Sequence, residues 1–152
     1  DAYNANPTSV SNAIESFSRI KNSKAVILGD MFELGNNSLD EHKKIITLLS
    51  SKNIDSCYFI GEDFFKVKST NESFYFYRTK EEFYNSSDEI LESYVLIKGS
   101  RGMKMEEIIE NKIKLITALQ KKLGDQKIDI VVNNFDNDKL IYSIAKNEGI
   151  RL

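Results

Sequence analysis

The chain has 152 residues, of which 41% are hydrophobic, so it has the size of one domain and enough apolar residues to bury a core. Its 21 basic and 23 acidic residues give a formal net charge of -2 without a long block of one sign, so neither nucleic acid nor a membrane surface is favoured as a partner. The single cysteine and single histidine exclude an internal disulfide and a Cys/His metal cluster, which favours a reducing, cytoplasmic setting. The sequence contains neither a membrane-length apolar run nor a secretory signal.

Residues 1–9 form a polar opening stretch that leads into a predicted helix. Asn6 can cap free backbone N–H groups, and Pro7 suits the first helical position. Apolar residues then recur at helical spacing from Val10 to Ile20. The start of such a helix carries a partial positive charge that favours anions such as phosphate, so we expect half of a binding site here. Because the chain begins at Asp1 inside this stretch, we also expect it to be a piece of a larger protein.

Strands and helices are predicted to alternate along the rest of the chain. The predicted strands are residues 24–28, 57–60, 73–77, 94–97 and 128–132. The predicted helices are one from Ser38, with Ser38 and Glu41 as a capping box, one from Lys80 to about Tyr84, one from Met103 to about Leu123, and one from Lys139 to Lys146. This alternation predicts an α/β fold with a mostly parallel sheet covered by helices on both faces.

Polar loops follow three of the predicted strands, and ligands of such sheets bind outside the carboxyl ends of the strands. We therefore expect the loops at residues 29–35, 61–63 and 98–102 to meet at one edge.

The loop of residues 98–102 contains Lys98, followed by Ser100 and Arg101 between two glycines, which suits a carboxylate or a phosphate. A strand-to-helix turn with solvated charges is an equally good interpretation. In the loop of residues 29–35, Asp30 and Glu33 could hold a ribose hydroxyl, an ammonium group or a hydrated magnesium ion. Taken alone, this loop is better explained as a turn, with Asp30 serving the turn and Glu33 in solvent.

The single histidine and the single cysteine are both better explained by structural roles. His42 lies close to the apolar face of its predicted helix and has no nucleophile beside it in sequence, so we expect a packed or hydrogen-bonded histidine. Cys57 lies inside an apolar strand, where a buried and inert thiol is expected.

Three motifs occur in order in this chain: residues 1–9, residues 29–35 with His42, and residues 98–102. Together they resemble the C-terminal domain of the Mur ligases. The resemblance covers about residues 1–109, and residues 110–152 are expected to be a helix-strand-helix tail of unknown origin. The resemblance implies a Rossmann-like sheet in a domain that closes against a central ATPase domain. It also implies an N-terminal domain before the central one.

The resemblance also implies an activity and roles for individual residues. The matching branch of the family is an ATP-dependent amide ligase of peptidoglycan synthesis that joins D-alanyl-D-alanine to UDP-N-acetylmuramoyl-tripeptide. The implied nucleotide contacts are Asp1, Tyr3, Asn4 and Asn6; the implied substrate contacts are Asp30, Glu33, Lys98, Ser100 and Arg101. The ATP phosphates and magnesium would be bound mainly by the other domains. We expect no catalytic residue and no metal ligand in this chain, which alone should be inactive.

Two other classes of function fit the residues taken alone. One is a noncatalytic α/β module that binds a nucleotide or an anion. The other is a flavodoxin-like regulatory domain built around Asp30, which would then be the site of phosphorylation.

Overall fold

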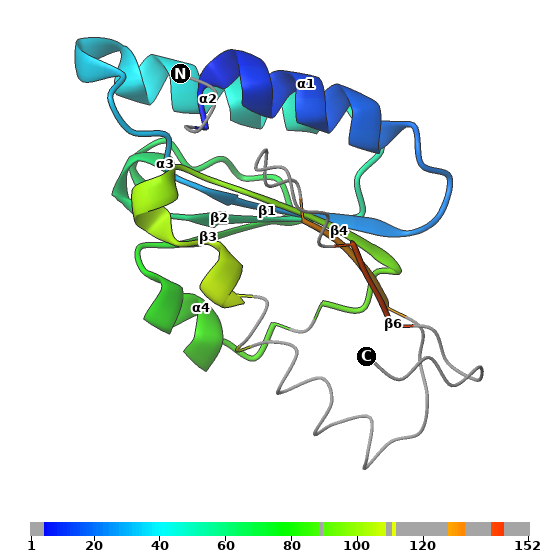
Figure 1. Ribbon diagram of the computed structural model, residues 1–152. Coiled ribbons are helices and arrows are strands. Elements are labelled where there is room, and N and C mark those ends of the chain that lie inside the picture. Colours follow the sequence, from blue (N-terminus) through cyan, green and yellow to red (C-terminus); the bar gives the residue numbers. More distant parts are fainter. Residues whose placement is uncertain (1–4, 89, 109–110, 112–127, 133–140, 145–152) are drawn as a thin grey trace.

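The computed structural model describes residues 5–88, 90–108, 111, 128–132 and 141–144. Six strands form one sheet in the order β3-β2-β1-β4-β5-β6 (Figure 1). The strands are β1 (Lys24–Gly29), β2 (Ser56–Ile60), β3 (Phe74–Tyr77), β4 (Tyr94–Lys98), β5 (Ile128–Val132) and β6 (Ile141–Ile144). Neighbouring strands from β3 to β5 are parallel, and β6 runs antiparallel to β5. The predicted mostly parallel sheet is confirmed.

Helices cover both faces of the sheet, as the alternating sequence pattern predicted. They are α1 (Pro7–Ser18), α2 (Ser38–Ser50), α3 (Glu62–Lys66) and α4 (Lys80–Asn85), with 3-10 turns η1 (Gly35–Asn37) and η2 (Arg101–Met103). In Figure 1, α1 and α2 lie on one face of the sheet and α4 lies on the other. Among the described residues no helix is long and apolar enough to cross a membrane.

Each face of the sheet has its own apolar core, because successive side chains of a strand point to opposite faces. On the side of α1 and α2, Val26, Leu28 and Phe59 pack against residues of these helices and against Phe64 of α3. On the side of α4, Ile27 and Ile97 pack against Phe83. All six residues of β1 are buried, as expected for the central strand of a sheet that is covered on both sides.

The two longer helices begin where the sequence predicted, but only one of them is capped as expected. Asn6 caps α1 by accepting a hydrogen bond from the Ser9 N–H. The predicted capping box at Ser38 is wrong, because Asn37 is the N-cap residue and its side chain makes no capping hydrogen bond. The 3-10 turn η1 runs directly into α2, so Ser38 lies inside the helix. Its hydroxyl instead donates a 2.6 Å hydrogen bond to Asp63.

The predicted helix over residues 139–146 is also wrong where the structure describes it, because residues 141–144 form β6. A short apolar run does not by itself distinguish a strand from a buried helix. Here β6 pairs with the edge of β5 that faces away from β4. In this antiparallel register Ile128 lies opposite Ile144 and Val131 lies opposite Ile141.

The helix predicted from Met103 begins later than expected. Residues 101–103 form the 3-10 turn η2, Lys104 is left-handed with a φ of 46°, and the described helical residues start at Glu106. The rest of that predicted helix lies outside the described residues. The strand predicted at residues 128–132 is confirmed as β5.

Candidate functional site

The polar loops that follow the central strands meet at one edge of the sheet. We call residues 30–37 the β1 loop and residues 99–104 the β4 loop. The Asp30 N–H donates to the Ile60 carbonyl at 3.1 Å, and the Ser100 N–H donates to the Asp30 carbonyl at 3.0 Å. The Gly61 N–H donates to the Tyr77 carbonyl at 2.9 Å, which adds β3 to the same edge. The predicted convergence of the loops is confirmed.

Two glycines let the β1 and β4 loops approach this closely. A Cβ on Gly99 would lie 3.0 Å from the Gly29 Cα and 2.7 Å from the Met105 Cγ. A Cβ on Gly29 would lie 2.6 Å from the Met105 sulfur. Packing thus accounts for these glycines, which the sequence alone left open between backbone geometry and anion binding.

Asp30 is buried beneath this edge, and its carboxylate holds the start of α3. The residue is only 5% exposed. Its Oδ2 accepts the Asp63 N–H and its Oδ1 accepts the Phe64 N–H, both at 3.0 Å. Burial raises the pKa of Asp30, while the two N–H groups oppose that rise. Its place as a substrate contact stays a prediction, and what the structure shows is a carboxylate that organises neighbouring backbone.

Gly61 makes room for the Asp30 carboxylate. A Cβ on Gly61 would lie 2.2 Å from the Asp30 Cγ and within 2.5 Å of both carboxylate oxygens. Gly61 also has a φ of 134°, which side chains rarely allow. The glycine after β2 and the aspartate after β1 are therefore parts of one arrangement.

His42 is fully buried and hydrogen-bonded, as the sequence predicted. Its Nε2 accepts the Met31 N–H at 3.0 Å, and its Nδ1 lies 2.7 Å from the Ser38 carbonyl. Nε2 can accept only without a proton and Nδ1 can donate only with one, so the ring is the neutral Nδ1–H tautomer. His42 therefore offers no cation to Asp30, although Nε2 lies 3.5 Å from Oδ1.

Helix α3 was not predicted, because residues 61–63 were expected at this edge only as a loop. The Ser38 hydroxyl on Asp63 lowers the pKa of that carboxyl and links α2 to α3. The available signal was Gly61 followed by Glu62 and Asp63, because acidic residues favour the first turn of a helix.

The predicted substrate residues of the β4 loop differ in exposure. Ser100 is 1% exposed, and its hydroxyl accepts the Phe32 N–H at 2.6 Å. Lys98, at the end of β4, is 8% exposed, and burial lowers its pKa. Arg101 is exposed, as is Glu33 in the β1 loop. The outer side of this edge therefore presents Arg101 and Glu33, while Ser100 ties the two loops together.

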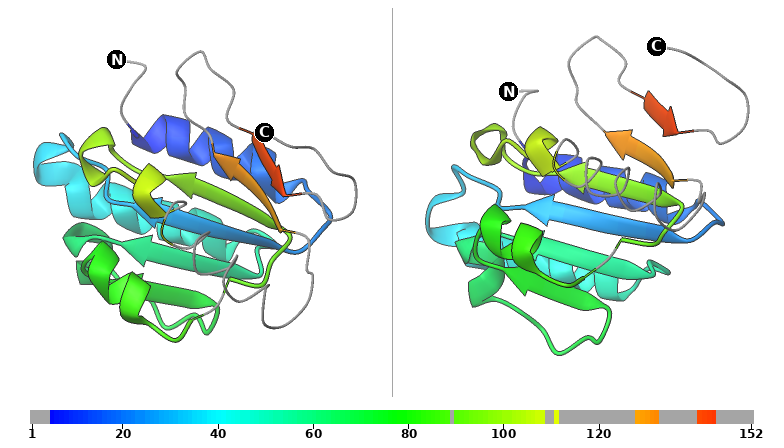
Figure 2. Two further views of the ribbon diagram at one scale, coloured as in Figure 1. Left: turned by 60° about the horizontal axis from the view of Figure 1, so that its bottom comes forward. Right: turned by 90° about the horizontal axis from the view of Figure 1, so that it is seen from below.

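The predicted nucleotide residues Asp1, Tyr3 and Asn4 lie outside the described residues. Asn6 is exposed, and its side-chain oxygen is 2.8 Å from the Ser9 nitrogen. Helix α1 begins on the side of the molecule where β1 ends (Figure 2). The start of α1 and the polar loops thus lie at the same end of the sheet.

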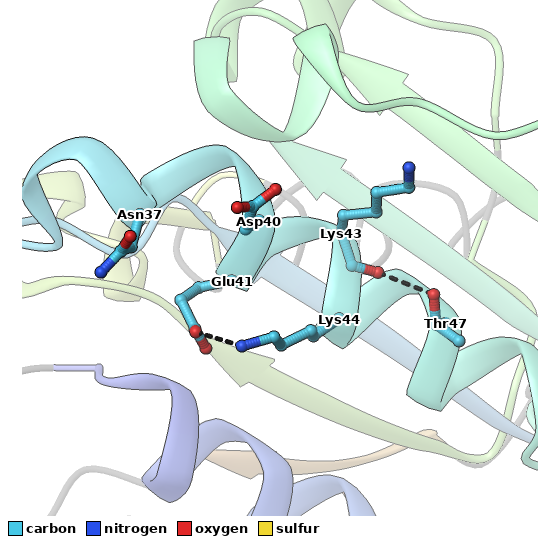
Figure 3. A pocket seen from close by; sticks show the side chains of 6 residues that line it. All are labelled: Asn37, Asp40, Glu41, Lys43, Lys44 and Thr47. Carbon is cyan, nitrogen blue, oxygen red and sulfur yellow. Dashed lines mark hydrogen bonds and ion pairs between the residues drawn. The ribbon is translucent and has the colours of Figure 1, made fainter.

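A hollow on the outer face of α2 contains none of the predicted site residues. It is lined by Asn37, Asp40, Glu41, Lys43, Lys44 and Thr47 (Figure 3). Lys44 and Glu41 form an ion pair at 2.6 Å, and the Thr47 hydroxyl donates to the Lys43 carbonyl. These contacts are those of an ordinary solvated helix face.

The described residues contain no group of three or more histidine, cysteine, aspartate or glutamate side chains that could hold a metal ion.

The fold and the edge are those of a known class of enzyme domain. The family described as Mur ligase, glutamate ligase domain, matches residues 1–132, and the chain belongs to this family. The match extends beyond residue 109, and β5 pairs with β4 in the same sheet. The separate tail from residue 110 stays a prediction.

Within the family, the chain is similar to ligases for D-alanyl-D-alanine. It is 33% identical over 118 residues to the UDP-N-acetylmuramoyl-tripeptide--D-alanyl-D-alanine ligase of Buchnera aphidicola from Acyrthosiphon pisum, covering 75% of this chain and 26% of that protein. It is 31% identical over 131 residues to the ligase of the same name from Bacillus subtilis, covering 74% of this chain and 27% of that protein. The chain thus spans about a quarter of the length of these curated relatives.

Solved structures show the same fold. MurF from Acinetobacter baumannii superposes with a TM-score of 0.64 at 25% identity, over 75% of this chain and 26% of that one. The MurF ligase of Thermotoga maritima, solved in complex with ADP, gives a TM-score of 0.64 at 24% identity, over 78% of this chain and 28% of that one. The chain is the C-terminal domain of a MurF-type Mur ligase.

Replacing Gly61 by alanine should be far more damaging than replacing Gly35. Both glycines have positive φ, but a Cβ on Gly35 meets nothing within 4 Å. Gly35→Ala should cost about 1 kcal/mol of unfolding free energy through backbone strain alone. Gly61→Ala adds a collision with the Asp30 carboxylate, so the loss should be about 3 kcal/mol or more in chemical denaturation. Equal losses would show that the carboxylate moves aside freely.

Asp30→Asn should change how stability depends on pH. Because the folded pKa of Asp30 is raised above 3.8, the folded protein takes up this proton at higher pH than the unfolded chain does. The contribution of the Asp30 carboxyl to the free energy of unfolding is therefore fully present at low pH. It is lost as the pH rises through the pKa that Asp30 has in the folded protein. In urea titrations from pH 7 towards pH 4, the wild type should gain stability relative to the asparagine variant. A difference that is flat or of opposite sign contradicts the raised pKa.

Proposed function

We propose that this domain closes over the substrates of an ATP-dependent ligase that adds D-alanyl-D-alanine to UDP-N-acetylmuramoyl-tripeptide in the cytoplasm. The observation that carries the proposal is the joined pair of β1 and β4 loops, which present Arg101 and Glu33 at the carboxyl edge. Family membership and the names of the relatives support this activity. The N-terminal and central ATPase domains would complete the enzyme.

The chemistry proposed for the whole enzyme forms an amide at the expense of ATP. The tripeptide carboxylate attacks the γ-phosphorus and releases ADP, giving an acyl phosphate. The amine of D-alanyl-D-alanine then attacks the acyl carbon, loses a proton and releases phosphate. An acyl phosphate is hydrolysed if water reaches it, so a domain that closes over it excludes water and orients the amine. The residues of this chain thus bind and orient, and the catalytic groups lie elsewhere.

The two ends of the dipeptide suit the two exposed charges at the edge. The guanidinium of Arg101 can make two parallel hydrogen bonds to the terminal carboxylate. Glu33 suits the ammonium end of the dipeptide before it loses its proton. Lys98 adds a buried positive charge at the end of β4. Asp30 and Ser100 support binding by fixing the loops that carry these charges.

The nucleotide would contact the opening residues of the chain. We assign Asp1, Tyr3 and Asn4 to the ribose and adenine, with Asn6 beside them at the start of α1. The complex of the Thermotoga maritima ligase with ADP agrees with nucleotide binding in this class of enzyme. Magnesium would be held mainly by the other domains.

Burial of Asp30 counts against a regulatory domain phosphorylated at this residue. A phosphate acceptor needs an accessible carboxylate, whereas Asp30 is 5% exposed and both oxygens accept backbone N–H groups. A noncatalytic binding module would bind nucleotide or dipeptide but release no phosphate, so an activity assay separates it from a ligase.

Arg101→Ala should lower dipeptide-dependent activity. This chain would replace the matching domain of the Bacillus subtilis ligase, and phosphate release would be measured with ATP, UDP-N-acetylmuramoyl-tripeptide and D-alanyl-D-alanine. Loss of the carboxylate contact should lower kcat/KM for the dipeptide about tenfold, or ~1.4 kcal/mol. Arg19→Ala is the control, because Arg19 is exposed at the other end of α1. A folded but inactive chimera would contradict the ligase proposal, and equal effects of both variants would contradict the role of Arg101.

Two substitutions of Asn6 separate capping from nucleotide binding. Asn6→Ala removes the cap and should cost about 1 kcal/mol of unfolding free energy. Asn6→Asp keeps a capping oxygen but removes the amide N–H donors, so stability should stay close to the wild type. If the amide donates to the nucleotide, Asn6→Asp should weaken ADP binding about three- to tenfold in calorimetry of the chimera. Unchanged ADP affinity in Asn6→Asp would limit Asn6 to its capping role.

A further inference from the structure

The β1 loop is held by three successive N–H groups, each of which donates to a different part of the molecule. The Asp30 N–H reaches the Ile60 carbonyl at the end of β2. The Met31 N–H reaches Nε2 of His42 on α2, and the Phe32 N–H reaches the Ser100 hydroxyl in the β4 loop. Of these three hydrogen bonds, the one from Met31 connects the loop to α2, and its acceptor is Nε2 of His42.

His42 connects the backbone of α2 to the backbone of the β1 loop. One ring nitrogen donates to the Ser38 carbonyl in the first turn of α2, and the other accepts from Met31. The ring is 0% exposed and lies edge-on against Phe64, with 4.5 Å between the ring centroids. Its orientation is therefore fixed by α2, by the loop and by α3.

The residues that follow Met31 would move with it. Phe32 is 43% exposed, and its ring lies over Gly102, where a built Cβ would be 3.0 Å from the nearest ring carbon. Glu33 has a φ of 64° at the turn of the loop. A shift at Met31 thus changes how Phe32 meets the β4 loop, and it moves Glu33, which follows Phe32 in the chain.

We propose that His42 is a positioning residue that sets the β1 loop against the β4 loop, and so sets the exposed Glu33 of one loop relative to the exposed Arg101 of the other for the incoming dipeptide. The effect on the dipeptide rests on the proposed function, whereas the hold on the loop does not. Only the ring's neutral form holds the loop, because Nε2 must be free of a proton to accept the Met31 N–H. The Asp30 carboxylate, 3.5 Å away, is held by Asp63 and Phe64 and does not replace this bond.

Two substitutions test the proposal because each keeps one of the two ring contacts. His42→Gln places an amide oxygen near the position of Nε2 and can still accept from Met31. His42→Asn places its amide near the position of Nδ1 and can still donate to Ser38, but it leaves the Met31 N–H without an acceptor. Both variants lose the contact with Phe64, so a purely structural histidine predicts similar effects from both.

The first measurement is amide hydrogen exchange by NMR on the 152-residue chain. The Met31 amide should exchange at least about tenfold faster in His42→Asn than in His42→Gln, because a buried donor without a partner is poorly protected. The amides of Asp30 and Gly61 are the internal controls, since they donate to backbone carbonyls and should differ little between the two variants. Equal exchange of Met31 in both variants would overturn the proposal.

The second measurement is steady-state kinetics of the ligase that contains this chain. His42→Asn should raise the KM for D-alanyl-D-alanine about tenfold, His42→Gln should restore most of that loss, and the KM for ATP should change little in either. The Met31 exchange rate could differ between the two variants while the KM for the dipeptide does not. His42 would then hold the loop, but the loop would have no part in binding the dipeptide, which overturns the positioning role. If the wild type releases no phosphate, the ligase function fails, while the exchange result still decides whether His42 holds the loop.

Discussion

The arrangement at the carboxyl edge depends on burying the charge of Asp30 in the space left by the missing side chain of Gly61. A buried carboxylate is costly unless hydrogen bonds compensate it, and here the first N–H groups of α3 provide them. This single interaction fixes where α3 begins and brings the ends of β1 and β2 together. Ser38 then reaches Asp63, so α2 is fixed to the same point. The exposed loops are therefore built on buried residues that hydrogen-bond to one another.

The polar residues at this edge differ in burial and in what they contact. Of the five residues implied as substrate contacts, Asp30 and Ser100 are nearly buried and make bonds within the protein, whereas Glu33 and Arg101 are exposed. Loops that are already ordered favour binding, because less conformational entropy is lost when a ligand arrives. The motif residues are thus of two kinds, those that meet solvent and those that hold the first kind in place.

Much of the fold could be predicted because local signals and the global fold agree. Asn6 and Pro7 start a helix, the apolar runs form strands, and parallel topology alone brings the polar loops to one edge. The failures have physical causes. The hydroxyl of Ser38 was expected to cap its own helix, but Asp63, from a distant part of the chain, is its partner. The run from Ile141 to Ile144 has no local preference strong enough to reveal that the edge of β5 would decide its structure. The sequence also could not show that Asp30 faces α3 while Arg101 faces solvent, since burial depends on neighbours that only the fold supplies.

The order of the strands also sets an order of assembly. The central strand β1 pairs with β4 in a register that joins Lys24 to Tyr94, so one side of β1 stays open while most of the domain is being synthesised. Such distant pairings form slowly, because a long stretch of chain must be ordered before they are gained. Ser100, which receives the Phe32 N–H, follows directly after β4. The hydrogen bond between Phe32 and Ser100 can therefore form only when β4 has paired with β1.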